Sequence, residues 1–263
     1  MIQRLYFTLL IYSLALNSVL TQINGVSGSK INAFNHLPIP VGTAEFEPNI
    51  GITRYSQYWD DNSNLQSVFQ SPDSLQIEST ISFRMAYPLS TKLELGTFIA
   101  TDFSNWSLKY ALGGDDKFGY GLMCGLNLPY GITTINKKSR TAEQISSYGL
   151  GIIGSYTINE TTSIDANLQY QDYLHTAPGL SDGDIFFSID YGKYIKGRTQ
   201  LMSSIVYSHS LGEETNGYVL TYYPGIGLES KGEYMIFLSG AIDLIGKNTL
   251  KTSGFAAAWT ITL

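Results

Sequence analysis

The chain ends on an alternating segment, Thr252 to Leu263, that constrains its fold more than any other stretch. Apolar residues occupy one set of alternate positions and small or weakly polar residues the other: Phe255, Ala257, Trp259, Ile261 and Leu263 against Gly254, Ala256, Ala258, Thr260 and Thr262. Successive side chains of a strand point to opposite faces, so this segment is a ribbon with one apolar face. A soluble protein must cover such a face with a second layer and protect the open edge. A closed barrel in a bilayer needs neither, because lipid covers the outer face and pairing with the first strand removes the edge.

The composition agrees with a chain whose surface is partly covered by lipid. Only 14% of the residues are charged, against roughly 25% in ordinary soluble domains, while Gly at 26 and Tyr at 19 are both abundant. The formal net charge is −6, the sequence pI is about 5.0, and we find no run rich in Lys and Arg. This balance argues against a nucleic-acid partner.

Residues 1–22 have the pattern of a secretory signal peptide. Arg4 precedes an apolar run from Leu5 to Leu16, which is too short to cross a bilayer as a helix. Cleavage is expected between residues 20 and 28. The alternative, a buried amphipathic helix, is disfavoured because the rest of the chain shows little helical periodicity.

The next segment, residues 23–46, contains Pro38 and Pro40 and has no periodicity. We expect it to be an extended periplasmic lead-in to the barrel, which would then occupy residues 47–263. The one cysteine, Cys124, cannot form an internal disulfide, and on the apolar face of a strand it serves as a small hydrophobic residue.

Twelve segments after the lead-in read as strands, most of them as long as the 9 to 11 residues that a tilted membrane strand needs. They are 47–59, 75–87, 92–102, 106–112, 118–128, 145–158, 162–173, 184–194, 199–209, 217–229, 234–245 and 251–263. Three features strain the assignment: Pro224 predicts a bulge or a split in its strand, Arg54 breaks the alternation of the first strand, and 106–112 is short. An even number is favoured, with ten or fourteen as the alternatives to twelve. The predicted fold is all-β: a single transmembrane antiparallel up-and-down β-barrel.

The connections favour a membrane barrel over a soluble sandwich. Long polar links at 60–74, 129–144 and 174–183 would lie at one end, and short links such as 88–91 and 159–161 at the other. An outer-membrane barrel with both termini in the periplasm has this asymmetry, and a Greek-key sandwich gives no reason for it.

Aromatic residues gather near both predicted ends of the strands, as the girdles of a membrane barrel do. The expected outer group is Tyr58, Trp59, Phe103, Trp106, Tyr130, Tyr148, Tyr173, Tyr207 and Tyr218, and the inner group is Tyr87, Phe118, Tyr156, Tyr191, Tyr194 and Tyr234.

The last segment, residues 252–263, also resembles the C-terminal assembly signal of bacterial outer-membrane proteins. That signal alternates in the same way and most often ends in an aromatic residue, whereas this chain ends in Leu263. The resemblance implies a bacterial outer-membrane location, contact with outer-membrane lipid, and recognition of residues 252–263 by the barrel-assembly machinery.

The strand faces predict which side chains line the lumen. The charged and amide candidates are Glu78, Arg84, Lys92, Glu94, Lys109, Asp165, Asn167, Gln169 and Asp190. Both signs are present, so no strongly ion-selective ring is indicated. These groups either pair with one another and stiffen the barrel or contact a solute. Inward apolar residues, namely Phe98, Met123, Phe186 and Tyr223, would suit a moderately hydrophobic or aromatic solute.

We expect no enzymatic activity, because the histidines lack partners for a catalytic triad. His36 lies in the lead-in and His175 in a predicted loop, while the serines beside His209 must point to the opposite face of their strand. We find no metal-ligand cluster and no phosphate-binding glycine pattern, so no catalytic residue, metal or cofactor is predicted.

Two short motifs carry a resemblance to a known family. Pro48 to Tyr55 reads PNIGITRY at the first strand, and Gly125 to Gly131 reads GLNLPYG at the end of the fifth. The chain from about Glu47 onward resembles a family of outer-membrane barrels regarded as transporters and named for a meta-pathway of phenol degradation. The resemblance implies passive uptake of small solutes, aromatic or hydrophobic ones among them. The alternative is a structural or adhesive barrel with a closed lumen and partner-binding outer loops.

Overall fold

The structure is a computed structural model. It describes residues 22–28, 30–71, 74–101, 103–129, 146–174, 182–212, 216–230 and 234–263. Apart from Gln22, the predicted signal peptide lies outside these residues. Within the described part of the chain, no helix is long and apolar enough to cross a membrane.

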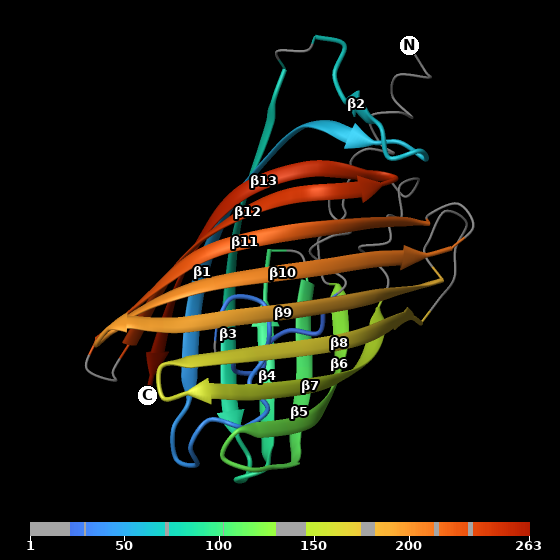
Figure 1. The fold of residues 1–263 in the computed structure, drawn as a ribbon. Coiled ribbons are helices and arrows are strands. Elements are labelled where there is room, and N and C mark those ends of the chain that lie inside the picture. Colours follow the sequence, from blue (N-terminus) through green and yellow to red (C-terminus); the bar gives the residue numbers. More distant parts are fainter. Residues whose placement is uncertain are drawn as a thin grey trace.

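Within the described residues, thirteen antiparallel strands form one sheet, and twelve of them make the wall of a closed barrel (Figure 1). They are β1 (Glu45–Trp59), β2 (Leu65–Ser67), β3 (Gln76–Pro88), β4 (Leu93–Ile99), β5 (Phe103–Gly114), β6 (Phe118–Pro129), β7 (Ser147–Asn159), β8 (Thr162–Tyr173), β9 (Gly183–Lys196), β10 (Thr199–Leu211), β11 (Gly217–Ser230), β12 (Tyr234–Lys247) and β13 (Thr249–Thr262). Every predicted segment has its strand, and the predicted twelve-stranded up-and-down barrel is confirmed. The extra strand, β2, is short and pairs with the end of β1.

The last wall strand closes the barrel by pairing with the first. The β1–β13 ladder runs from Glu45 opposite Thr262 to Trp59 opposite Thr249. Reciprocal backbone hydrogen bonds between Ala44 and Leu263, of 3.0 and 2.8 Å, extend the seam past both strands. Because the seam is paired along its length, the wall has no open edge with unpaired backbone N–H and C=O groups. A sheet surrounded by hydrocarbon must meet this condition.

The connections divide as predicted. The links of residues 89–92, 115–117, 160–161 and 197–198 are short and lie at the end where β1 begins and β13 stops, while 60–75, 130–146 and 174–182 join strands at the opposite end. We call these the inner end and the outer end. The β1–β2 extension projects from the outer end (Figure 1).

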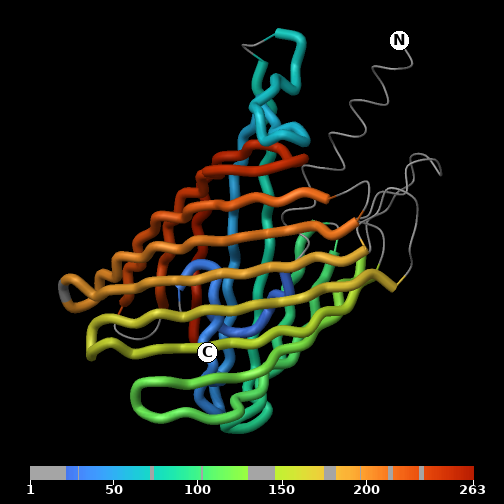
Figure 2. Tube along the Cα trace, turned by 45° about the vertical axis from the view of Figure 1, so that its right-hand side comes forward, coloured from blue at the N-terminus to red at the C-terminus, as the bar shows by residue number. Residues whose placement is uncertain are grey.

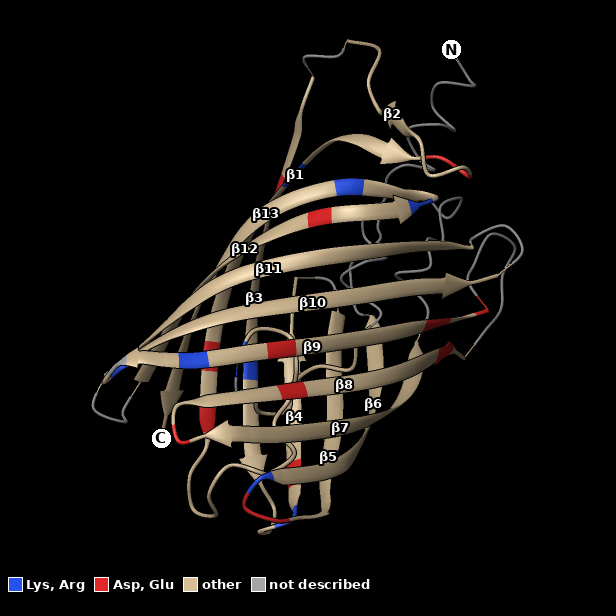
Figure 3. Ribbon diagram, in the orientation of Figure 1, with Lys and Arg blue, Asp and Glu red and all other residues tan. Residues whose placement is uncertain are grey.

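Exposure alternates along each strand in the sense opposite to a soluble protein. On β8, Leu168 and Tyr170 are 44% and 43% exposed, whereas Asp165 and Gln169 are 2% and 1% exposed. Apolar side chains therefore cover the outside and polar side chains the inside. Charged residues are few along the strands (Figure 3), as a surface in contact with lipid requires.

The aromatic belts are only partly as expected. At the inner end Tyr87, Phe118, Tyr156, Tyr191 and Tyr234 are exposed on the outer surface, and at the outer end so are Trp106 and Tyr148. Trp59 and Phe103 are instead buried, each 4% exposed. Tyr173 donates to Asp184 at 2.6 Å on the lumen side. Tyr130 lies outside the described residues.

The strained positions are accommodated without breaking a strand. β11 continues through Pro224, which stays opposite Ser203 of β10. On the β12 side the ladder skips Tyr223 and Pro224, and the register shift falls earlier, between Leu220 and Thr221. Proline has no N–H to donate, and the unpaired position on the β12 side means that no ladder hydrogen bond requires one there. Arg54 points outward and its Nε donates to Ser253 at 3.0 Å.

The segment expected as a periplasmic lead-in, residues 23–46, does not lie outside the barrel. Glu45 and Phe46 begin β1, and Val41 before them is exposed. The described residues further toward the N-terminus lie inside the lumen, seen in blue within the ring of strands (Figure 2). We call the described residues from 22 to 39, namely 22–28 and 30–39, the plug. The plug has no periodicity because it is surrounded by wall side chains of different kinds rather than packed on one apolar face.

The outward face of β8 gives a direct test of the lipid contact. Replacing Leu168 with Arg should lower the free energy of unfolding in liposomes by about 2–4 kcal/mol, the cost of an arginine near the bilayer midplane. Thr53→Arg, with the side chain facing the lumen, is the control and should cost much less. Urea titrations followed by tryptophan fluorescence measure both, and equal losses would contradict the assignment of faces.

Candidate functional site

The plug enters the lumen near the outer end and follows the wall toward the inner end. At its start the Ile23 backbone N–H donates to Gln169 Oε1 of β8 at 2.6 Å, and that of Asn24 donates to Asn105 Oδ1 of β5 at 3.0 Å. Further on, an isolated antiparallel bridge between Gly28 and Phe34 folds the plug into a small hairpin. The hairpin spans the lumen: Ser27 contacts β4 and β5, whereas Lys30 and Ile31 contact β8 and β9.

One anchor of the plug is a fully buried ion pair on β4 and β5. Lys109 Nζ lies 3.1 Å from Glu94 Oε1, and both side chains are 0% exposed. Ser27 links the plug to both: its N–H and Oγ donate to Glu94 at 2.6 and 2.8 Å, and its Oγ accepts from Lys109 at 2.6 Å. Ile39 N–H adds a bond of 2.8 Å to Glu94. Buried charges of this kind are tolerated only when paired and hydrogen-bonded.

The second anchor holds the hairpin on β8 and β9. Lys30 forms an ion pair with Asp165. The backbone N–H groups of residues 31–33 all donate to Asp190 Oδ2, at 2.8, 2.7 and 3.0 Å. Asp165 and Asp190 are directly opposite one another in the β8–β9 ladder. We call this set, Lys30 and residues 31–33 on Asp165 and Asp190, the latch. The latch places the Lys30 ammonium group and three backbone N–H donors beside two carboxylates that would otherwise repel each other.

A third charged cluster lies toward the inner end around Arg84 of β3. Its guanidinium lies 3.1 Å from Glu45 and 2.8 Å from Glu47 on β1. It also donates to the Val26 carbonyl of the plug at 3.2 Å. This cluster therefore joins the β1–β3 wall to the plug.

Inward glycines give the plug its room. An added Cβ at Gly96 would lie 2.3 Å from the plug backbone at Gly25 and Val26, and one at Gly119 would lie 1.9 Å from the His36 ring. Gly125, Gly149, Gly192 and Gly225 are similarly filled by side chains of the plug. Ile23, Val26 and Phe34 of the plug pack with Met123 and Ile153 of the wall in one buried apolar cluster.

The plug does not fill the whole lumen. A cavity of about 400 Å³ remains between the plug and a wall formed mainly by β1, β3 and β11–β13, with one or two residues each from β4, β5, β9 and β10. We call it the vestibule. Its lining reaches from Thr53, Thr101 and Ser208 near the outer end to Glu47 and Arg84, where the plug forms its floor.

The wall of the vestibule is built from small residues, which is why space remains there. Gly51, Ser239, Ala241, Gly254 and Ala256 line it from β1, β12 and β13. The opposite half of the wall carries the long polar side chains that hold the plug. The difference in side-chain size between the two halves thus sets where the plug lies and where the lumen stays open.

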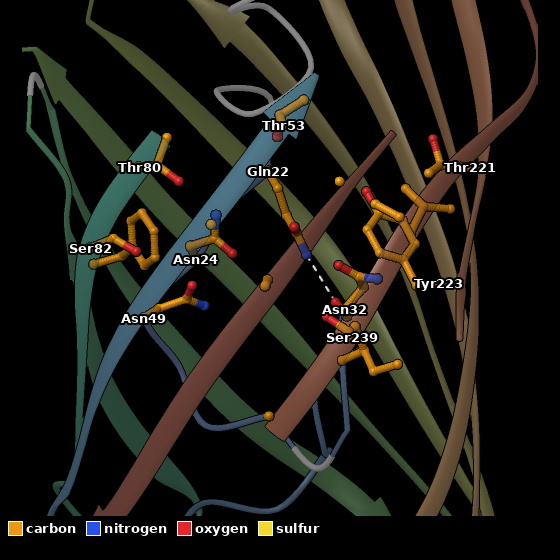
Figure 4. A pocket seen from close by; sticks show the side chains of 18 of the residues that line it. Gln22, Asn24, Asn32, Asn49, Thr53, Thr80, Ser82, Thr221, Tyr223 and Ser239 are labelled. Carbon is orange, nitrogen blue, oxygen red and sulfur yellow. Dashed lines mark hydrogen bonds between the residues drawn. The ribbon is translucent and has the colours of Figure 1, made fainter. Parts of the chain in front are cut away.

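The vestibule is lined mainly by neutral groups. Amides and hydroxyls surround it, as Figure 4 shows for Gln22, Asn24, Asn32, Asn49, Thr53, Thr80, Ser82, Thr221, Tyr223 and Ser239. The rings of Phe98, Phe103, Phe186, Tyr223 and Phe237 add apolar surface. The carboxylate of Asp243 accepts from Thr221 and Thr252 at 2.6 to 2.7 Å. Arg84 is paired with Glu45 and Glu47, whereas Asp243 and Glu78 are held by hydrogen bonds from neutral groups of the wall.

The predicted lumen residues separate into three groups. Arg84, Glu94, Lys109, Asp165, Gln169 and Asp190 are buried and bind the plug. Asn167 is buried and accepts from Ser188 at 2.8 Å, and Glu78 borders the vestibule and accepts from Tyr55 at 3.1 Å. Lys92 instead lies exposed in the turn between β3 and β4, because the strand begins one residue later.

Sequence reasoning missed the plug side of these contacts. Ser27 and Lys30 have no flanking pattern that marks them, and their partners come from distant strands. The available signal was the inward face of β6, where Gly119, Gly121 and Gly125 leave three of the inward positions without a side chain. A row of inward glycines indicates that something other than the wall fills the lumen there.

The two histidines that the structure describes, His36 and His209, lie apart from one another. His36 is in the plug, where burial lowers its pKa below the usual value, and Asp165 partly opposes that shift. His209 is hydrogen-bonded to Asn216 at 3.1 Å near the outer end of β10. His175 lies outside the described residues. Among the residues that are described, no group of three His, Cys, Asp or Glu side chains is placed to hold a metal ion.

The contact between Gly96 and the plug backbone predicts a large effect from one methyl group. Gly96→Ala should lower the free energy of unfolding by about 1–3 kcal/mol. The added methyl group would lie between the backbone of β4 and the backbone of the plug, and neither backbone can move away easily. Gly154→Ala is the matched control, with its nearest neighbour 4.0 Å away, and should change stability by less than about 0.5 kcal/mol. Denaturant titrations in detergent compare them. Similar stabilities for the two variants would show that the plug does not lie against β4.

Comparison with known proteins gives a fold but no family. No family model matches the chain, and no curated protein sequence matches it. The COG4313 outer membrane channel from Pseudomonas putida F1 superposes with a TM-score of 0.71 at 11% identity, over 89% of this chain and 100% of that one. NanC porin gives 0.52 at 6% identity, over 81% of this chain and 100% of that one. KdgM porin in complex with disordered oligogalacturonate gives 0.52 at 7% identity, over 81% and 98%. The chain therefore has the fold of the outer-membrane channel barrels, and its apolar outer surface places it in the bacterial outer membrane.

Proposed function

We propose that the protein is a passive channel or facilitator that lets small solutes, aromatic or hydrophobic ones among them, cross the outer membrane. The observation that carries the proposal is the vestibule, a cavity of about 400 Å³ bordered by neutral polar groups and aromatic rings. A site of this size and mixed character suits a small organic molecule.

The chemistry of the vestibule favours neutral solutes with an apolar part. Rings such as Phe98, Phe186 and Phe237 offer apolar contact, and amides such as Asn49 offer hydrogen bonds that orient a polar substituent. Arg84 is paired with Glu47, and Asp243 is hydrogen-bonded to Thr221 and Thr252, so the described lining offers no ring of like charges that would select for ions.

Two further lines support a channel. The motifs PNIGITRY and GLNLPYG resemble a transporter family named for a meta-pathway of phenol degradation, and membership of that family is part of this proposal. The three similar solved structures compared above are a channel and two porins. We further propose that no catalytic step is involved, and that the assembly machinery recognises residues 252–263, which form β13 and one side of the seam.

One observation favours the alternative of a structural or adhesive barrel: the plug occupies half of the lumen. In that case the β1–β2 extension, with Leu65 42% exposed at the outer end, would be part of a partner-binding surface. The two functions differ in whether solutes cross, so a flux measurement separates them.

Filling the vestibule should block transport. Ser239→Trp places an indole ring in the cavity and should reduce solute flux several-fold, because the ring takes up a large part of the free volume. Leu238→Trp is the matched control on the same strand, with the ring pointing to lipid, and should leave flux unchanged. Liposome swelling with a panel of small aromatic, aliphatic and charged compounds measures both.

The pattern across the panel tests the solute class. Aromatic and aliphatic neutral compounds should enter faster than charged compounds of equal size. If the unmodified protein passes no member of the panel and carries no current in planar bilayers, the barrel is closed and the alternative function holds. If charged compounds enter fastest, the channel stands and the proposed solute class is wrong.

A further inference from the structure

We infer that the plug is a gate: residues 22–39 leave the lumen while the barrel stays closed, and the latch on Asp165 and Asp190 sets how often they do so. This inference rests on the proposed channel function, since it concerns how the vestibule is connected to the inner end.

The barrel does not depend on the plug for its integrity. Its wall closes through the β1–β13 ladder, and each wall strand pairs with two neighbours. Within the described residues, the only bridge that involves the plug is the internal one between Gly28 and Phe34. The plug is therefore held by side chains of the wall and can leave without breaking a ladder.

The apolar contribution of the plug is small. Its buried apolar side chains are Ile23, Val26, Ala33, Phe34 and Ile39. Such a cluster holds the plug in place but is far smaller than the apolar core that keeps a soluble domain folded. Most of the remaining contacts are polar, and water can replace polar contacts when the lumen fills.

The wall side chains around the plug are polar enough to be hydrated when the plug leaves. Among them, Asn127, Asn167 and Gln200 are buried amide residues that face inward from β6, β8 and β10. Water in an open lumen can hydrogen-bond to such groups, so the wall loses little when its contacts with the plug are exchanged for contacts with water.

The latch opposes this exchange with strong contacts. Charge-assisted hydrogen bonds are stronger than neutral ones, and Asp190 Oδ2 accepts from the backbone N–H groups of residues 31–33. Lys30 compensates Asp165, which lies directly opposite Asp190. Closed and open states thus differ in whether this acidic pair, like Glu94 and Lys109 of the first anchor, is bound by the plug or by water.

The position of the hairpin gives its movement a consequence. Val26, Lys30 and residues 31–34 line the vestibule from below, at the level of Arg84 and Glu47. While the hairpin is latched, the vestibule ends there. When it leaves, the vestibule extends toward the inner end, and a solute can pass.

An engineered disulfide tests the movement directly. An added Cβ at Gly149 would lie 2.8 Å from Ile23 Cγ1, close to the Cβ–Sγ separation across a disulfide, so Ile23→Cys with Gly149→Cys should cross-link plug and wall. Cys124→Ala removes the native thiol. In the reduced protein, refolded in liposomes, a water-soluble methanethiosulfonate reagent should label the buried pair, because the plug exposes it on leaving. A third thiol in the vestibule, introduced by Thr53→Cys, should react at once and shows that the reagent enters.

A matched pair of variants tests the latch. In the reduced background, Asp190→Asn should speed labelling of the buried thiols at least about tenfold, because it removes the charge that three donors bind. Asp184→Asn is the control: that carboxylate is on the same strand, is equally buried and inward, and lies outside the vestibule lining, but it accepts a hydrogen bond from Tyr173 of the wall. It should leave the labelling rate unchanged.

The outcomes separate the gate from the channel. Two results together support the gate and the channel. The thiol pair is labelled, and faster in Asp190→Asn, and the cross-linked protein carries current only after the disulfide is reduced. If the vestibule thiol of the Thr53→Cys variant reacts while the pair stays unlabelled, or if both aspartate variants behave alike, the gate is wrong. If the pair is labelled but no solute or ion crosses in any state, the plug moves and the channel function fails.

Discussion

Every feature of this molecule depends on one constraint: backbone N–H and C=O groups in hydrocarbon must be hydrogen-bonded within the protein, because no water is there to bind them. The seam between β1 and β13 meets that constraint by pairing Glu45 through Trp59 with the final strand. Once the wall is closed, side-chain alternation assigns apolar residues to lipid and polar residues to the lumen. The composition of the chain, poor in charge and rich in glycine and tyrosine, follows from this division of surfaces.

The lumen is then a polar interior of modest width, and its two halves differ. Long charged and amide side chains on β4–β9 converge on the plug, whereas Gly51, Ala241 and Gly254 keep the β1–β13 side open. Buried charges such as Lys109 and Glu94 are acceptable because each has a partner on the facing strand or on the plug. The same arrangement fixes the position of the plug and leaves a vestibule beside it, which is the site proposed for a solute.

The wall was predictable from the sequence because successive side chains of a strand alternate between lipid and lumen. Hydrophobicity therefore repeats every two residues over the length of each strand. The twelve strands, the division of long and short links and the inward position of residues such as Asp165 all follow from that period. The plug has no such period, since each of its residues meets a different wall side chain, and its contacts join positions more than fifty residues apart, as Ile23 and Gln169 do. Turn residues also escaped prediction: Lys92 has the parity of an inward residue but precedes its strand. Pro224 was accommodated by a gap in one ladder rather than by a bulge at that position.

The most direct test of the central claim is a nitroxide scan along β8, residues 164 to 171, in liposomes. Accessibility to oxygen, which concentrates in lipid, and to a water-soluble nickel complex reports what each side chain touches. The account predicts that the even positions, including Leu168 and Tyr170, are accessible to oxygen and that the odd positions are shielded from it, with a period of two. A scan in which both sets respond alike, or in which the even positions favour the nickel complex, would contradict a lipid-facing apolar surface and with it the barrel's assignment to a membrane.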